Sequence, residues 1–297
     1  MPRHASHAQA YAARFRRVFD YIEKNLDTAL TVETLSQVAN FSRFHFHRQF
    51  SDYTGVGVFR YVQLLRLKRA SLRLAFSPLD KVIDIALEAG FENPESFSRA
   101  FKHIFGQTPS AFRKAPDWAR WSEHYKLQQL PSSARRQDME KKLTVSIVDF
   151  KTTRVAAIEH RGPPELINRT VGHFIEWRKA SGLSPVATAR SFGIAYDNPD
   201  TTPPAQFRFD ICGSVDGEVP PNDYGIVGKT IAGGRCAVVR HLGSHARIGE
   251  SIYPLFREWL PASGEELRDF PLFFHYLNLM PATPEHALIT DIHLPLK

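Results

Sequence analysis

The sequence is poor in cysteine and has no long apolar run. Among its 297 residues are only two cysteines, Cys212 and Cys236, and their separation matches no common metal-ligand spacing. No stretch approaches the roughly 20 apolar residues that a membrane-spanning helix needs, and residues 1–9 lack the apolar segment of a secretory signal. We therefore expect a cytoplasmic protein with reduced thiols, no metal or cofactor, and no membrane partner.

Acidic residues are scarce in the first half of the chain. Residues 1–142 hold 23 Lys and Arg against 14 Asp and Glu, a net charge of +9, whereas residues 143–297 carry −2. A basic segment suits a polyanionic partner, because Lys and Arg displace counterions from phosphates. The length itself predicts two domains of roughly 100–200 residues each.

The first half has helical periodicity and an internal repeat. Helices are expected at 11–25, 31–39, 43–53, 58–74, 82–89 and 95–105. Twice the pattern is helix, tight turn, helix, which is the helix-turn-helix motif. The second copy follows about 50 residues after the first, with Phe50 matching Phe101 and Gly55 matching Gly106. The sequence thus predicts two helix-turn-helix units in one domain.

Residues 11–115 resemble the AraC/XylS family of transcription regulators. The likeness rests on the segments 84–91 (DIALEAGF), 96–102 (SFSRAFK) and 105–113 (FGQTPSAFR). It implies an all-α domain in which the second helix of each unit enters the major groove of double-stranded DNA. It also implies an activator that recruits RNA polymerase, and we expect the protein to bind DNA as a monomer.

A recognition helix must bury one face and offer the other to base edges, and the repeated phenylalanines are expected on the buried face. The residues predicted to contact DNA are Arg43, Phe44, His47, Arg48, Asn93, Glu95, Ser96, Arg99 and Lys102. Arg48 can bind guanine through two hydrogen bonds, and Phe44 can pack on a thymine methyl group. The alternative for these positions is an ordinary solvated charged face.

The segment 117–142 is polar and is predicted to be a linker between a first domain at 1–116 and a second at 143–297. Pro131 and the serines that follow it have the composition of a flexible connection. Trp118, Trp121 and Tyr125 lie near its start, and this aromatic group could dock onto one of the domains.

The second half contains another repeat. Strands are expected at 143–149, 154–161, 191–196, 207–213, 235–243, 272–277 and 286–295, with helices at 166–180 and 252–259. The segment 235–243 parallels 154–162, which lies 81 residues earlier. Two strand-helix-strand-strand units side by side predict an α+β domain with a groove at their pseudo-twofold axis.

This half resembles the GyrI-like small-molecule-binding domain, mainly through residues 265–278 and 290–296. Behind an AraC-type domain, it forms the architecture of the Rob-like regulators, in which an aromatic groove binds amphipathic or cationic effectors. The residues predicted to line the pocket for a hydrophobic or amphipathic effector are Trp177, Phe192, Tyr196, Trp259, Phe274 and Tyr276. Each could instead be plain core. His160 and His241, at equivalent repeat positions, are interpreted as inherited with the fold and not as metal ligands.

Phe274 stands where the family often has a glutamate, and its neighbour His275 is expected to face the other way. The phenylalanine removes the charge that would pair with a cationic effector, and the carboxylate that some members use for hydrolysis. We therefore expect no enzymatic activity. Two alternatives stay open for this domain: a hydrolase that uses the groove, or a protein-docking module without a ligand.

Overall fold

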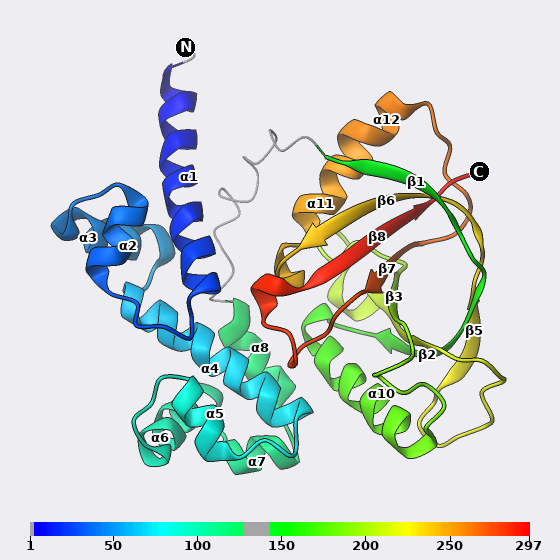
Figure 1. The fold of residues 1–297 in the computed structure, drawn as a ribbon, viewed down its shortest axis with the longest axis horizontal. Helices are drawn as coiled ribbons and strands as arrows, with labels where there is room; N and C mark the ends of the chain where they lie inside the picture. The colour runs from blue at the N-terminus through cyan, green and yellow to red at the C-terminus, as the bar shows by residue number, and fades with distance from the viewer. Residues whose placement is uncertain (1–2, 127–142) are drawn as a thin grey trace. The chain divides into compact units, whose positions relative to one another are not determined.

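The computed structural model describes residues 3–126 and 143–297 (Figure 1). Contacts within the chain divide it into two units, Met1–Glu140 and Lys141–Lys297. Within the described residues, the helices are all too short or too polar to cross a membrane.

The first unit is helical, as the sequence predicts. Its helices are α1 (Arg3–Lys24), α2 (Val32–Ala39), α3 (Arg43–Thr54), α4 (Val58–Phe76), α5 (Val82–Glu88), α6 (Pro94–Phe105), α7 (Pro109–Lys114) and α8 (Trp118–Lys126). The pairs α2–α3 and α5–α6 are the two predicted helix-turn-helix units, and α4 connects them. The double helix-turn-helix fold is confirmed.

Short polar residues and glycines set the ends of the helices in both helix-turn-helix pairs. The side chains of Thr31, Ser42 and Asn93 each accept a hydrogen bond from the backbone N–H three residues further on, which caps α2, α3 and α6. Gly55 and Gly106 end α3 and α6 with φ values of 78° and 72°, in the left-handed region that glycine adopts without steric cost. The two recognition helices therefore begin and end by the same chemistry.

The segment predicted to be a linker begins with a helix instead, α8. Trp118 stacks on Phe76 of α4 with ring centroids 5.6 Å apart, and Trp121 Nε1 donates to Ser71 Oγ at 2.7 Å. Burial of two indole rings outweighs the polar composition of this stretch, because each ring removes a large apolar area from water. Trp118 and Trp121 thus dock onto the first unit, whereas the side chain of Tyr125, and Pro131 with its neighbours, lie outside what the structure describes.

The second unit is built on one eight-stranded sheet. Its strands are β1 (Val145–Phe150), β2 (Thr153–Arg161), β3 (Ser191–Ala195), β4 (Arg208–Ser214), β5 (Val227–Ile231), β6 (Gly234–Leu242), β7 (Leu272–Tyr276) and β8 (Ile289–Pro295). The order is β1-β6-β8-β7-β3-β4-β2-β5, and all neighbours are antiparallel. This confirms the predicted α+β class.

Each half of the second unit is strand-strand-helix-strand-strand, one strand more than the predicted repeat. The strand missing from the prediction is β5, whose sequence has a glycine and a lysine at its centre and so lacks a clear apolar alternation. The two halves also exchange their first strands, since β1 pairs with β6 and β5 pairs with β2. The centre of the sheet, between β3 and β7, is therefore the pseudo-twofold axis.

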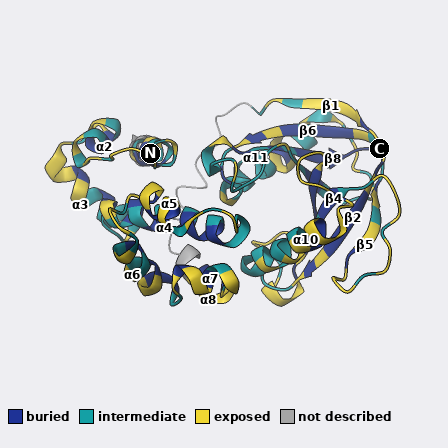
Figure 2. Ribbon diagram, turned by 60° about the horizontal axis from the view of Figure 1, so that its bottom comes forward, coloured by how far each residue is buried: buried dark blue, intermediate teal, exposed yellow. Residues whose placement is uncertain are grey.

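Helices cover one face of this sheet (Figure 2). The helical segments of this unit are η1 (Pro164–Leu166), α10 (Ile167–Ser181), η2 (Pro204–Gln206), η3 (His245–Arg247), α11 (Gly249–Pro254), the π-helical turn η4 (Leu255–Trp259), α12 (Leu260–Ser263) and η5 (Glu285–Ala287). The helix expected at 252–259 thus covers more residues, from Gly249 to Ser263, and is irregular. Pro254 lies inside it without a backbone donor, which favours a break in the regular hydrogen-bond pattern.

Candidate DNA-binding surface and effector site

The first recognition helix, α3, separates a buried aromatic face from an exposed polar one. Phe46 and Phe50 are fully buried, and Phe50 packs against the rings of Phe46, of Phe19 in α1 and of Tyr61 in α4. On the other face Arg43, His47 and Arg48 are exposed, and Figure 2 shows exposed residues along this helix. The amphipathic pattern of α3 therefore leaves its basic side chains for solvent or a partner.

Phe44 is the most unusual residue of this exposed face. It is 93% exposed, although a phenylalanine ring gains about 1.5–3 kcal/mol when it is fully buried. Phe59, at the start of α4, is also exposed, and its ring lies 6.4 Å from that of His47. Sequence reasoning missed Phe59, and an apolar residue directly after the turn that ends α3 was the available signal.

The ion pairs on α3 are weak. Arg43 is 3.5 Å from Glu33, and Arg48 is 3.9 Å from Asp52, with the Arg48 side chain 85% exposed. Exposed pairs at these distances contribute about 0–1 kcal/mol, because water screens both charges. Either guanidinium can thus exchange its carboxylate for another acceptor at small cost.

The second recognition helix, α6, repeats this arrangement. Phe97 and Phe101 are fully buried, while Arg99 is exposed on the opposite face. The remaining predicted residues of this group lie along the helix and at its N-terminus, with Glu95 and Lys102 exposed. Glu95 in the first turn is also favoured by the helix dipole, which is a sufficient structural reason for its presence.

Asn93 and Ser96 have a structural role at the start of α6. Ser96 N donates to Asn93 Oδ1 at 2.8 Å, and Ser96 Oγ donates to the Asn93 carbonyl oxygen at 2.9 Å. These bonds cap α6 and occupy the Asn93 side-chain oxygen and the Ser96 hydroxyl, two groups that were predicted to contact DNA. Eight of the nine predicted residues thus lie in α3 or α6, and Asn93 caps the start of α6. Their contact with DNA stays a prediction.

In the second unit, three aromatic side chains lie at the pseudo-twofold axis. Gly193 of β3 pairs with Phe274 of β7 at the centre of the sheet. A Cβ atom on Gly193 would lie 2.4 Å from Phe209 and 2.6 Å from the Tyr276 hydroxyl, so these rings occupy the space above the glycine. Phe209 also stacks on Phe274, with centroids 6.0 Å apart.

Three of the six predicted pocket residues share one cluster. Phe274 and Phe209 belong to one buried cluster on the helix-covered face, and Trp259 and Tyr276 pack against that cluster. Burial raises the pKa of the Tyr276 hydroxyl. Trp177 belongs to a neighbouring cluster under α10, where it stacks on Phe174. Phe209 was missed by sequence reasoning, although its alternation with Phe207 along the β4 region was a usable signal.

Phe192 and Tyr196 lie on the other face of the sheet, so the six residues do not form one group. Phe192 stacks on His275 with centroids 4.8 Å apart, and Tyr196 donates to Asp210 Oδ2 at 2.7 Å. Burial and the Asp210 carboxylate raise the pKa of Tyr196 to about 12. The cause is register: Phe192 is paired with His275, and both alternate with the Gly193–Phe274 pair. The prediction that His275 faces away from Phe274 is confirmed.

His160 and His241 make the same two contacts in the two halves. His160 Nδ1 is 2.8 Å from Thr170 Oγ1, and His241 Nδ1 is 2.9 Å from Ser251 Oγ. Each Nε2 lies 3.1 Å from a backbone carbonyl oxygen, of Pro163 or of Ser244. Each imidazole therefore ties the end of a strand to the helical segment that follows. In the part of the chain that the structure describes, no group of His, Cys, Asp and Glu is arranged to hold a metal ion.

Comparison with known proteins identifies both domains. A family model described as "GyrI-like small molecule binding domain" matches residues 143–297, and one described as "Helix-turn-helix domain" matches residues 35–115. The probable transcriptional regulator YgiV of Escherichia coli strain K12 is 49% identical over 154 residues, which cover 52% of this chain and 96% of YgiV.

Other matches are more distant. The right origin-binding protein of Escherichia coli strain K12 is 34% identical over 110 residues, covering 36% of this chain and 37% of that protein. The crystal structure of the EcmrR C-terminal domain is 17% identical, has a TM-score of 0.45, and covers 52% of this chain and 98% of that one. The chain thus belongs to the family of transcriptional regulators in which an AraC-type helix-turn-helix domain precedes a GyrI-like small-molecule-binding domain.

Proposed function

We propose that this regulator recognises a bipartite double-stranded DNA site, with α3 reading one half-element and α6 the other. The observation that carries the proposal is the equivalence of the two exposed faces. Arg48 and Arg99 lie 51 positions apart, as do the buried Phe50 and Phe101. Both helices therefore carry an exposed arginine at the same position relative to their buried phenylalanines.

These arginines suit guanine, since a guanidinium can donate to O6 and N7 together. Phe44 suits a thymine methyl group, because its exposed ring would lose water contact in the major groove. The net charge of +9 on residues 1–142 supports binding to phosphates on either side of the bases.

A monomer is the binding species in this proposal. Helix-turn-helix proteins with one recognition helix dimerise to cover two half-sites about one helical turn apart. This chain carries two recognition helices itself, so it needs no partner subunit to span such a site. As in the AraC/XylS family it resembles, the bound protein would then activate transcription by recruiting RNA polymerase.

The second unit binds a neutral hydrophobic or amphipathic effector in this proposal. The GyrI-like family model supports a small-molecule site, and the aromatic side chains of Phe274, Tyr276 and Phe209 at the pseudo-twofold axis, in the cluster against which Trp259 also packs, support an apolar ligand. Phe274 offers neither a charge for a cation nor a carboxylate for hydrolysis, which favours a sensor over an enzyme.

Selection of genomic fragments by the purified protein, followed by binding at several salt concentrations, tests the DNA part. We expect one sequence motif with two half-elements and an affinity that falls steeply with salt. Weak binding that is indifferent to sequence would contradict it. Melting curves with a panel of neutral hydrophobic compounds test the effector part, because a ligand of the folded state raises the melting temperature.

A further inference from the structure

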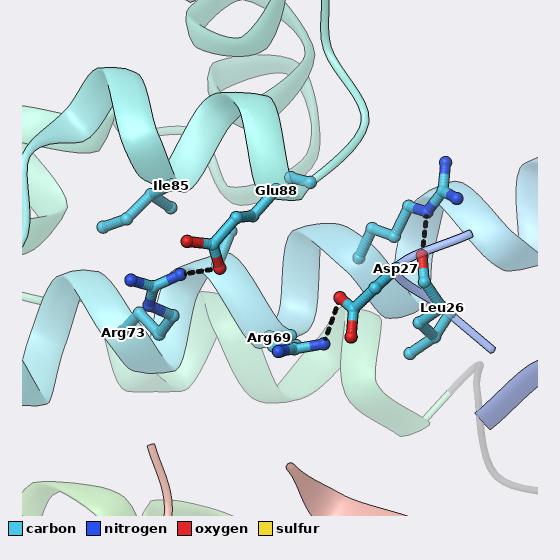
Figure 3. A pocket seen from close by; sticks show the side chains of 9 residues that line it. Leu26, Asp27, Arg69, Arg73, Ile85 and Glu88 are labelled. Atoms are coloured by element: carbon cyan, nitrogen blue, oxygen red, sulfur yellow. Dashed lines mark hydrogen bonds and ion pairs between the residues drawn. The ribbon is translucent and has the colours of Figure 1, made fainter. Parts of the chain in front are cut away.

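Three arginines line one side of α4 between the two helix-turn-helix units. Arg66, Arg69 and Arg73 are spaced i, i+3 and i+7, which places them on one face of the helix. They line a pocket together with residues from the α1–α2 loop and from α5. We call these three residues the arginine row. Figure 3 shows Arg69 directed at Asp27 and Arg73 directed at Glu88.

The row holds the loop that leads into the first helix-turn-helix pair, α2–α3. Arg66 Nε donates to the Leu26 carbonyl oxygen at 2.9 Å, and its other branch donates to the Thr28 carbonyl oxygen at 2.8 Å. Arg69 pairs with Asp27 Oδ1 at 2.6 Å. Three consecutive residues of the chain, 26–28, are thus fixed to α4 just before α2 begins.

The same row also holds the second helix-turn-helix pair, α5–α6. Arg73 donates to Asp80 Oδ2 at 2.9 Å and 2.6 Å, before α5, and also pairs with Glu88 at the end of α5. Arg66 reaches this side as well, because a Cβ atom on Gly90 would lie 2.5 Å from its guanidinium. Gly90 has a φ of 79° in the turn that leads to α6, so only glycine suits both the backbone and the contact.

We propose that the arginine row sets the orientation of the two recognition helices on α4, and thereby the spacing of half-elements that the protein accepts. The inference rests on the proposed bipartite DNA recognition. Arg–carboxylate pairs at partly exposed positions add little to folding stability, but a planar guanidinium with several acceptors fixes direction well. The contacts of the row are therefore better suited to orientation than to stability.

Orientation matters because α3 and α6 belong to one chain. Once the first helix is bound, the second binds at an effective concentration that depends on how well the connection holds it in place. A rigid connection favours one spacing and rejects others. A loose one loses affinity for the best spacing and tolerates its neighbours.

The row could alternatively contact DNA phosphates, and paired variants distinguish the two roles. Asp27→Asn with Glu88→Gln breaks contacts of the row from the acidic side, and Arg69→Gln with Arg73→Gln breaks them from the basic side. The acidic-side variant raises the net charge by two, whereas the basic-side variant lowers it by two. Asp84→Asn with Glu123→Gln, two exposed carboxylates outside the row, is the matched charge control.

The experiment measures the dissociation constant of the full chain for duplexes that carry the selected site with its half-elements at the natural spacing, or moved by one base pair either way. A duplex with a single half-element is included. We expect the wild-type protein and the charge control to prefer one spacing by about tenfold or more. Both row variants should lose most of this preference while binding the single half-element like a protein of the same net charge. Melting curves verify that each variant is folded.

A spacing preference retained in both row variants would overturn the inference. So would a pattern in which the basic-side variant weakens every duplex equally and the acidic-side variant tightens every duplex, because that is the signature of phosphate contacts. A wild-type protein without preference for the two-element duplex over the single one would overturn the proposed bipartite recognition itself, and the inference with it.

Discussion

Phe274 of β7 lies opposite Gly193 of β3, and the two residues are also equivalent positions of the internal repeat, 81 residues apart. The pair therefore marks the pseudo-twofold axis of the second unit. One half contributes a ring to the helix-covered face at this point, and the other contributes only backbone. The absent side chain makes room for Phe209 and Tyr276, so the aromatic cluster depends on the asymmetry of the pair.

Gly193→Ala should destabilise the second unit. The added methyl group would meet Phe209 and Tyr276 inside normal contact distance, and overpacking of this kind costs about 1–3 kcal/mol. Urea unfolding of the full chain measures the change. Gly172→Ala is the matched control, since nothing lies within 4 Å of its added Cβ and alanine favours the α10 helix. Equal stability of the two variants would contradict the crowding at Gly193.

Phe274→Glu should reverse the charge preference of the effector site. A carboxylate in this apolar cluster would attract a lipophilic cation and would disfavour a neutral aromatic compound of the same shape. We expect a gain of about tenfold in affinity for the cation, which corresponds to about 1.4 kcal/mol. Phe274→Gln separates the loss of the ring from the gain of charge. Calorimetry with the cation and its neutral analogue measures both, and an unchanged ratio of affinities would place the effector elsewhere.

Arg48→Ala and Arg99→Ala should each weaken binding to the selected site by about 1–3 kcal/mol, because each removes two hydrogen bonds to a guanine. The loss should be confined to one base pair in each half-element, so substitution of that base pair should add nothing further in the variant. Arg154→Ala, an exposed arginine of the second unit, is the control for charge alone. Unchanged affinity in both recognition-helix variants would refute the assignment of these contacts.

The first unit was predictable from sequence because its information is local. Caps such as Ser42 and Asn93, the glycines at 55 and 106, and the repeated phenylalanines all act within a few residues of chain. The side on which Arg48 and Arg99 lie follows from the same helical spacing. Three helices departed from expectation. The first begins at Arg3 and not at residue 11, and α7 was not among the predicted helices. The third is α8, whose two tryptophans outweigh its polar neighbours.

The second unit was less predictable because its information lies in pairings between distant strands. The exchange of β1 and β5 between the halves cannot be read from either strand alone. The register of β3 against β7 decided which predicted pocket residues meet, and it placed Phe192 with His275 and not with Phe274. Alternation shows that neighbours face apart, but it does not show which face of the sheet the helices cover.

His275 makes the stability of the second unit dependent on pH. Burial is the largest cause that lowers the pKa of His275 to about 4, and repulsion from His293, Arg190 and Arg240 adds to it, whereas the Asp291 carboxylate raises this pKa. Burial also lowers the pKa of His293. Since an unfolded histidine titrates near pH 6.5, the unfolded chain binds more protons between about pH 6.5 and 4.

The stabilisation is therefore complete above pH 6.5 and decreases as the pH falls through this window, by about 1–3 kcal/mol. Urea unfolding of the full chain at pH 7.0, 5.5 and 4.5 measures the decrease. His275→Gln should reduce the slope because glutamine does not titrate, and His293 would account for the part that remains. An identical pH dependence in the variant and the wild-type protein would show that His275 is already free to accept a proton in the folded state, contrary to its burial beside His293 and Arg190.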